Sequence, residues 1–214
     1  RRLEPIVSWA WREAGCGSML IDLTSAKAEL VEALGLFGDF TANGYHNIQL
    51  ETWFPYLVNT DVAHGLELTP WREVAFQYNL ERLGLAGAPV LPVGSWLGAR
   101  PEPWTISITT GYPMTHEVFY LTDFGARPMN LADDLREYLQ TWLPAWQQIF
   151  RNPEHLDLLS ELVMTAACIH SDPGLEVSQL LAERQSDDGS VAGPRGAGHD
   201  LPSPTGDLAR RRFL

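Results

Sequence analysis

The regular spacing of apolar residues is the feature that most restricts how this chain can fold. Apolar side chains recur every three or four positions through most of its 214 residues. After Pro153, for example, the same helical face receives Leu156, Leu159, Leu162 and Ala166. This period is typical of amphipathic helices, whereas the alternating patterns typical of β-strands are almost absent. We therefore expect an all-α protein built from antiparallel helix pairs.

Glycine and proline interrupt the helical pattern in one long segment. Residues 86–112 contain many residues that do not fit a helix interior, among them Gly87, Pro89, Pro92, Gly94, Gly98, Pro101 and Pro103. We expect a long Gly/Pro-rich loop over 86–112, in which 106–109 could form a short strand, although an isolated strand has nothing to pair with. A connection of this length is often a lid or a binding loop. We expect one helical domain over 1–185 and a disordered or weakly packed tail over 186–214.

Composition and charge exclude several classes of partner. Hydrophobic residues make up 45% and charged residues 20% of the chain, as in globular proteins. A net charge of −12 argues against binding to nucleic acid or to an anionic membrane surface, because both need basic patches. No stretch reaches membrane-spanning length. Cys16 and Cys168 match no metal-ligand spacing and indicate reduced thiols. We expect a soluble, cytoplasmic protein with no metal or other cofactor.

The residues most able to carry chemistry are concentrated in the stretch 115–125, T-H-E-V-F-Y-L-T-D-F-G. If this stretch is helical, His116, Phe119, Tyr120 and Asp123 share one face, at positions i, i+3, i+4 and i+7. A face that mixes imidazole, phenol and carboxylate is typical of a pocket wall. His116 is the natural general acid or base, with Tyr120 or Asp123 orienting it. The alternative is a His–Asp–Tyr hydrogen-bond network that fixes helix packing.

These residues and two further histidines are the candidate site. The catalytic candidates are His116, Glu117, Tyr120 and Asp123, and the ligand-binding candidates are Phe119, His46 and His64. A metal is not expected, because Tyr120 stands where the second histidine of H-E-x-x-H would be. His116 and Asp123 would also lie about 10 Å apart along a helix, too far to share one ion.

Two further motifs resemble metal-binding sequences. Residues 123–125, Asp-Phe-Gly, match the kinase magnesium motif, but the rest of a kinase sequence is missing. Asp133, Asp134 and Glu137 have the form of the diphosphate–magnesium motif of terpene synthases. Acidic residues in a first helical turn are also favourable without any ligand, because they face the positive end of the helix dipole. Both readings of this acidic motif remain open at this point.

Two segments resemble known helical families. Residues 185–190, Q-S-D-D-G-S, resemble the Q-x-x-D/E-G-S turn of squalene-cyclase-like and protein-prenyltransferase-like α/α toroids, with Val191 where an aromatic residue usually follows. The stretch 115–125, together with 152–153 and 157–162, resembles an uncharacterised, mainly actinobacterial family of helical, toroid-like proteins. The resemblance spans residues 6–191. It implies an α/α toroid with a pocket at its centre, and it implies no particular reaction.

The end of the chain bears on this expected ring. In such toroids more helix pairs follow the Q-x-x-D-G turn, whereas here the chain passes into Gly193-Pro194-Arg195-Gly196. We therefore expect an incomplete ring whose exposed apolar surface favours oligomerisation or a protein partner. The chain also begins without Met, as a fragment or an incomplete gene model would.

Three functions fit these observations. The first is a small-molecule-binding protein or enzyme of bacterial metabolism, with a pocket lined by residues 115–125. The second is a non-catalytic helical-repeat module that binds a protein partner across the open face of the toroid. The third is a terpene-cyclase-like enzyme, which requires Asp133, Asp134 and Glu137 to face a cavity.

Overall fold

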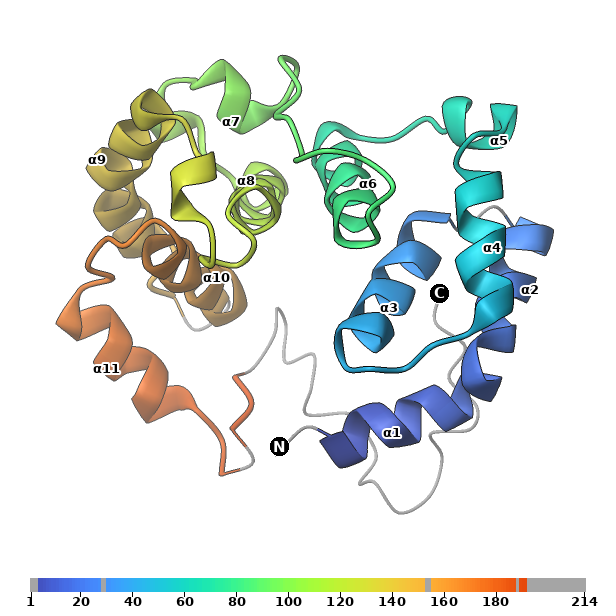
Figure 1. Cartoon of the computed structure of the whole chain (residues 1–214). Coiled ribbons are helices and arrows are strands. Elements are labelled where there is room, and N and C mark those ends of the chain that lie inside the picture. Colours follow the sequence, from blue (N-terminus) through green and yellow to red (C-terminus); the bar gives the residue numbers. More distant parts are fainter. Residues whose placement is uncertain (1–3, 28–29, 153–154, 188, 192–214) are drawn as a thin grey trace. The chain divides into compact units, whose positions relative to one another are not determined.

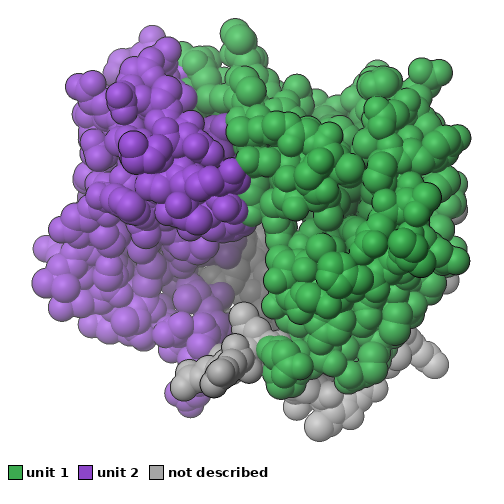
Figure 2. Space-filling model, viewed as in Figure 1, with its two compact units in different colours: residues 1–99 green, residues 100–214 purple. Residues whose placement is uncertain are grey.

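The computed structural model describes residues 4–191, except 28–29, 153–154 and 188. Every regular element in these residues is a helix, so the all-α prediction is confirmed. The chain divides into two compact units, residues 1–99 and 100–214 (Figure 2). Most of the tail expected over 186–214 lies outside the described residues. The single domain expected over 1–185 stays a prediction.

Unit 1 contains the first seven α-helices and one 3₁₀ turn (Figure 1). They are α1 (Glu4–Glu13), the turn at Gly15–Gly17, α2 (Ser18–Lys27), α3 (Leu30–Ala42), α4 (Ile48–Leu57), α5 (Asp61–His64), α6 (Pro70–Arg82) and α7 (Trp96–Ala99). The sequence explains where α4 begins, because the Asn47 Oδ1 accepts hydrogen bonds from the backbone N–H groups of Gln49 and Leu50, at 2.9 and 3.2 Å. Its Nδ2 donates to the carbonyl of Cys16 at 2.7 Å, which ties α4 to the turn before α2.

The core of unit 1 is apolar and dense. α3 packs against α6, and α2 packs against both α3 and α4. Leu20, Leu34, Leu50 and Phe54 from these helices are at most 1% exposed. Burying a side chain of this size stabilises the fold by about 1.5–3 kcal/mol. The packing of α2, α3 and α4 therefore fixes the orientation of the outer face of α4.

Unit 2 contains four α-helices and two 3₁₀ turns. They are the turn at Pro103–Thr105, α8 (Ile108–Leu121), the turn at Pro128–Asn130, α9 (Asp133–Ile149), α10 (Leu156–Cys168) and α11 (Leu175–Arg184). α10 packs against α8, α9 and α11, so it is the central helix of this unit. Its buried stripe includes Leu159, Leu162 and Ala166, as the apolar spacing predicted.

The loop predicted over 86–112 is shorter and more ordered than expected. The predicted strand at 106–109 is wrong, because Ser107 caps α8: its backbone N–H donates to the Thr110 Oγ1 at 2.9 Å. Gly111 and Pro113 lie inside α8. Gly111 is accommodated by packing, since a Cβ there would lie 3.0 Å from the Leu158 side chain of α10.

Both ends of this segment are attached to their own unit. In unit 1, the backbone N–H of Val90 donates to the Gln77 side chain of α6 at 2.7 Å. In unit 2, the Trp146 indole donates to the carbonyl of Pro103 at 2.8 Å, and the Tyr138 hydroxyl donates to that of Pro101 at 2.7 Å. The two ends of the segment are therefore held within their own units.

Candidate functional site

The helix that carries the stretch 115–125 ends before the stretch does. α8 ends at Leu121, and Asp123, Phe124 and Gly125 all have positive φ angles, of 51°, 51° and 88°. The predicted position of Asp123 at i+7 on the His116 face is therefore wrong, because two left-handed residues turn the chain away from the helix axis. The Asp123 carboxylate lies instead 3.4 Å from the Nε of Arg127.

Polar side chains of α8 meet two carboxylates of α10. The Nδ1 of His116 lies 2.8 Å from the carbonyl oxygen of Tyr112 and 3.5 Å from the Oε2 of Glu161. The Thr115 hydroxyl donates a hydrogen bond to the same Glu161 oxygen. The Tyr112 hydroxyl donates to the Asp157 Oδ2 at 2.8 Å. We call Tyr112, Thr115, His116, Asp157 and Glu161 the α8–α10 polar cluster.

Burial shifts the protonation equilibria of this cluster. Burial raises the pKa of the Glu161 carboxyl above its usual value, and Asp157 adds to the rise. The hydrogen bond from Thr115 and the nearby His116 act in the opposite direction. Burial, with the hydrogen bond to Asp157, also raises the pKa of the Tyr112 hydroxyl. The cluster therefore favours the protonated forms of these two groups, and it joins α8 to α10.

Four aromatic rings form a closed circuit beside this cluster. His116 contacts Phe119 and Tyr120, with ring centroids 5.8 and 6.1 Å apart. Phe124 completes the circuit, at 5.5 Å from Phe119, on which it stacks, and at 6.1 Å from Tyr120. Phe119 is 4% exposed, whereas Phe124 is 53% exposed. We call these four residues the aromatic quartet.

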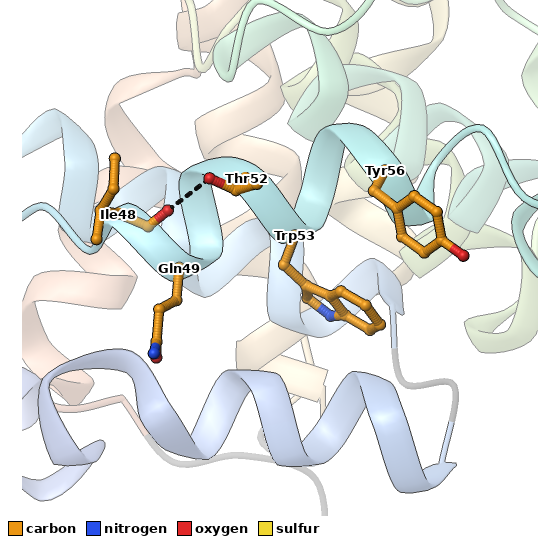
Figure 3. A pocket seen from close by; sticks show the side chains of 5 residues that line it. All are labelled: Ile48, Gln49, Thr52, Trp53 and Tyr56. Carbon is orange, nitrogen blue, oxygen red and sulfur yellow. Dashed lines mark hydrogen bonds between the residues drawn. The ribbon is translucent and has the colours of Figure 1, made fainter.

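A shallow, open depression of about 620 Å³ lies along α4 in unit 1 (Figure 3). It is lined by Ile48, Gln49, Thr52, Trp53 and Tyr56. Ile48 is 74% and Tyr56 is 64% exposed. The Trp53 indole N–H donates to the Thr24 Oγ1 of α2 at 2.8 Å, which holds its ring against the neighbouring helix. Figure 3 shows Gln49 and Trp53 pointing to the same side of α4. We call this feature the α4 groove.

A smaller pocket, of about 320 Å³, also lies in unit 1. It is lined by Ala63, Leu66, Leu68, Glu73, Phe76, Gln77 and Leu80. Neither this pocket nor the α4 groove contains a residue of the stretch 115–125.

The family model of DUF6895, a domain of unknown function, matches residues 1–214. The chain belongs to DUF6895. No curated protein and no solved structure matches it. The prediction of an uncharacterised family is therefore confirmed, whereas the motif and the actinobacterial origin stay predictions. Among the described residues of this DUF6895 domain, no helix has the length and hydrophobicity needed to cross a membrane.

The DUF6895 structure brings part of the predicted site together. His116, Phe119 and Tyr120 are in ring contact. Glu117 lies on the core side of α8 and is 1% exposed. The other two predicted histidines are both exposed and both belong to unit 1. His46 precedes α4, with its Nδ1 3.0 Å from the Glu51 carboxylate, and His64 is the last residue of α5.

The terpene-cyclase condition is not met. Asp133, Asp134 and Glu137 are exposed on the first turns of α9. Asp134 forms an ion pair with Arg100. Among the residues that the structure describes, no group of three or more His, Cys, Asp or Glu side chains is placed to hold a metal ion. The acidic start of α9 is explained by the helix dipole and by this ion pair.

Sequence reasoning missed four members of the polar cluster, Tyr112, Thr115, Asp157 and Glu161. The sequence contains the spacing that places them on two helical faces. Tyr112, Thr115 and His116 stand at i, i+3 and i+4 of one helix, and the two acids stand at i and i+4 of another. The sequence alone does not predict that α8 packs against α10, because α9 lies between them in the chain.

Proposed function

We propose that this DUF6895 domain is a non-catalytic interaction module that binds an amphipathic helix of a protein partner in the α4 groove. The exposed apolar lining of the groove is the observation that supports this function. Ile48 and Tyr56 keep most of their surface in water, and they line the same depression as Trp53, so they form an exposed apolar patch and not isolated exposed residues. Covering one such side chain contributes about 1.5–3 kcal/mol to binding when burial is complete.

The dimensions and hydrogen bonding of the groove favour a helix as the bound element. The lining residues extend from Ile48 to Tyr56, which is ~12 Å along a helix at ~1.5 Å per residue. Two turns of a partner helix cover this length with apolar residues at i, i+4 and i+7. Strand addition is not supported, because no strand edge occurs among the described residues.

Charge indicates the character of the partner. The chain has a net charge of −12, and the charged residue of α4 is the acidic Glu51. A partner helix with Lys or Arg beside its apolar face is therefore complementary to this surface. Such complementarity raises the association rate more than it raises the affinity, and added salt weakens it.

A selection from a displayed library of helical peptides tests this function. We expect wild-type protein to enrich peptides with apolar residues at i, i+4 and i+7 and basic residues beside them. Counter-selection against the Tyr56→Glu variant should remove them. Bound peptide should shift the NMR signals of the Ile48 methyl groups and the Trp53 indole N–H. The proposal would be contradicted if the enriched peptides bound the Tyr56→Glu variant as well as the wild type, or if they shifted only NMR signals of unit 2.

A second candidate function is a small-molecule-binding protein or enzyme of bacterial metabolism that uses the stretch 115–125. The contact between His116 and Glu161 supports it, because such a pair is suited to proton transfer. In this function His116 exchanges the proton, and Tyr120, in ring contact with it, orients the ligand. A thermal-shift screen of metabolites against wild type and His116→Gln tests it. A compound that stabilises only the wild type supports this function, whereas equal shifts count against it.

We also place the domain in the cytoplasm of a bacterium. The two cysteines support this location: Cys16 is exposed, Cys168 is buried, and both are free thiols. Alkylation in intact cells should modify Cys16 without prior reduction. Recovery of Cys16 in a disulfide would contradict a cytoplasmic location.

A further inference from the structure

The aromatic quartet has features that neither helix packing nor the α4 groove requires. We infer that these four residues, His116, Phe119, Tyr120 and Phe124, bind an organic cation, namely a methylated ammonium group or an arginine guanidinium group. The inference concerns unit 2 and does not depend on the function proposed for unit 1.

The geometry of the rings suits a cation. The four neighbouring centroid distances lie between 5.5 and 6.1 Å and close into a circuit. Phe119 and Phe124 stack with an interplanar angle of 18°, and Tyr120 stands at 85° to Phe124. A cation within ~6 Å of the centroid of an exposed ring face is attracted to that face. Phe119 is the buried floor, at 4% exposed, and Phe124 is the outer wall, at 53% exposed.

The charges near the quartet favour a cation over an anion. The Glu161 carboxylate lies 3.5 Å from the His116 ring, and Asp157 precedes it by one turn of α10. Asp123 adjoins Phe124 in the sequence and is partly balanced by Arg127, at 3.4 Å. The carboxyl groups of Glu161 and Asp123 therefore lie beside the quartet, and the rings themselves attract cations through their π faces.

The backbone supplies an independent observation. Asp123 and Phe124 both adopt the left-handed region, which costs roughly 1–2 kcal/mol for a residue such as Phe124, whereas Asp enters it more readily. A turn that only ended α8 would form more easily with glycine at these positions. Here the backbone N–H of Phe124 donates to the carbonyl of Phe119 at 2.8 Å, and the exposed ring is held over the helix. Such strain is concentrated at ligand sites in proteins.

Titration of the full chain with matched probes tests the inference. The cations are tetramethylammonium and the peptide acetyl-Ala-Arg-Ala-amide. The neutral counterparts are tert-butanol and the same peptide with citrulline in place of arginine. We expect the cations alone to give saturable shifts of the Tyr120 and Phe124 ring signals. Equal shifts with the neutral probes, or shifts confined to other residues, would overturn the inference.

Two ring variants test the role of the aromatic faces. Phe124→Leu keeps an apolar side chain and removes the π face, so cation binding should weaken about fivefold. Trp104→Leu, at another exposed aromatic residue of unit 2, is the control and should bind as the wild type does. If Phe124→Leu does not fold, Tyr120→Leu takes its place with the same expectation. Unchanged affinity in the folded variant would overturn the inference.

The same titration distinguishes the source of the cation. Tighter binding of tetramethylammonium than of the arginine peptide indicates a free small molecule, and the reverse order indicates a side chain of a protein partner. Ile48→Glu, in the α4 groove, should leave either affinity unchanged. Peptide binding at the α4 groove and cation binding at the aromatic quartet are therefore tested independently of each other.

Discussion

At Gly125 the turn after α8 meets the C-terminal end of α10. The residue has a φ of 88°, and a Cβ there would lie 3.1 Å from the Cα of Cys168. The turn is closed by the backbone N–H of Arg127, which donates to the carbonyl of Thr122 at 2.7 Å. This close approach, together with the positive φ, explains why residue 125 is glycine.

Gly125→Ala should therefore destabilise the chain. A side chain at this position meets both an unfavourable φ and the backbone of α10, and we expect a loss of about 2–3 kcal/mol. Gly84→Ala is the matched control, because Gly84 has a φ of 70° and nothing within 4 Å of the added Cβ. Urea unfolding should show a clearly smaller loss for the control. Equal losses would show that the contact with Cys168 contributes nothing.

Glu161 should make stability depend on pH. Burial raises its folded-state pKa above the unfolded value near 4.5, so its favourable contribution is present below about pH 4.5 and is lost as the pH rises through the folded value. Glu161→Gln cannot ionise, and its amide oxygen can still accept the Thr115 hydrogen bond. The stability of this variant relative to wild type should therefore increase from pH 4.5 to 7. A difference that is constant over this range would contradict the stated cause.

At the scale of single residues, the sequence predicted which side chains of α8 lie together better than it predicted which side chains of other segments they contact. The spacing of His116, Phe119 and Tyr120 correctly placed three rings on one helical face. Asp123 was misplaced because the helix ends two residues earlier, although Gly125 is a recognisable helix-end signal. Phe124, the left-handed residue before it, carries no such signal, since its side chain does not favour that conformation.

At the scale of elements, the α4 groove depends on how α4 is held by α2. Trp53 provides a polar connection between the two helices, through its indole N–H and Thr24. Thr24 in turn donates to carbonyls of its own helix, at 3.0 and 3.1 Å. These hydrogen bonds therefore hold the Trp53 ring, which lines the groove, against α2 of unit 1.

Trp53→Phe tests this connection. The substitution keeps an aromatic ring and removes the donor, so the free energy of unfolding should fall by about 1 kcal/mol. Trp104→Phe is the control, because Trp104 is 76% exposed and such surface changes stay within about 0.5 kcal/mol. A loss for Trp53→Phe no greater than for the control would show that the hydrogen bond does not fix the groove.

The apolar spacing predicted that helices form, but it predicted less well where each helix begins and ends. The start of α6 illustrates a local signal, because Pro70 occupies the first turn, where proline is tolerated. The start of α8 was missed because Gly111 and Pro113 are helix-breaking residues that tertiary packing tolerates here. Local propensity could not reveal the Leu158 side chain that packs against Gly111.

At the scale of the whole molecule, the chain is two units joined within the segment once expected to be a loop. The boundary lies after Ala99. Val93 is 93% exposed, between Val90, which is bonded to α6, and Leu97, which is buried. Composition and apolar spacing predicted the all-α class. They did not indicate two units, because packing partners such as α3 with α6 are distant in the sequence.

Limited proteolysis with elastase should detect this junction. Exposed backbone that few contacts restrain is cleaved first. Among the described residues, we expect the first cut next to Val93, giving one fragment that ends there and one that begins at Gly94. A first cut within α3 or α10, identified by mass spectrometry, would contradict the division at this place.

The affinity of a selected helical peptide for two matched variants tests the central claim most directly. Ile48 and Leu175 are each the first residue of a helix, and they are 74% and 72% exposed. Glutamate at either position suits the helix dipole, so both variants should fold. We predict that Ile48→Glu weakens peptide binding at least tenfold, which is about 1.4 kcal/mol, and that Leu175→Glu leaves it unchanged. Equal affinities for the two variants would contradict a binding function for the α4 groove.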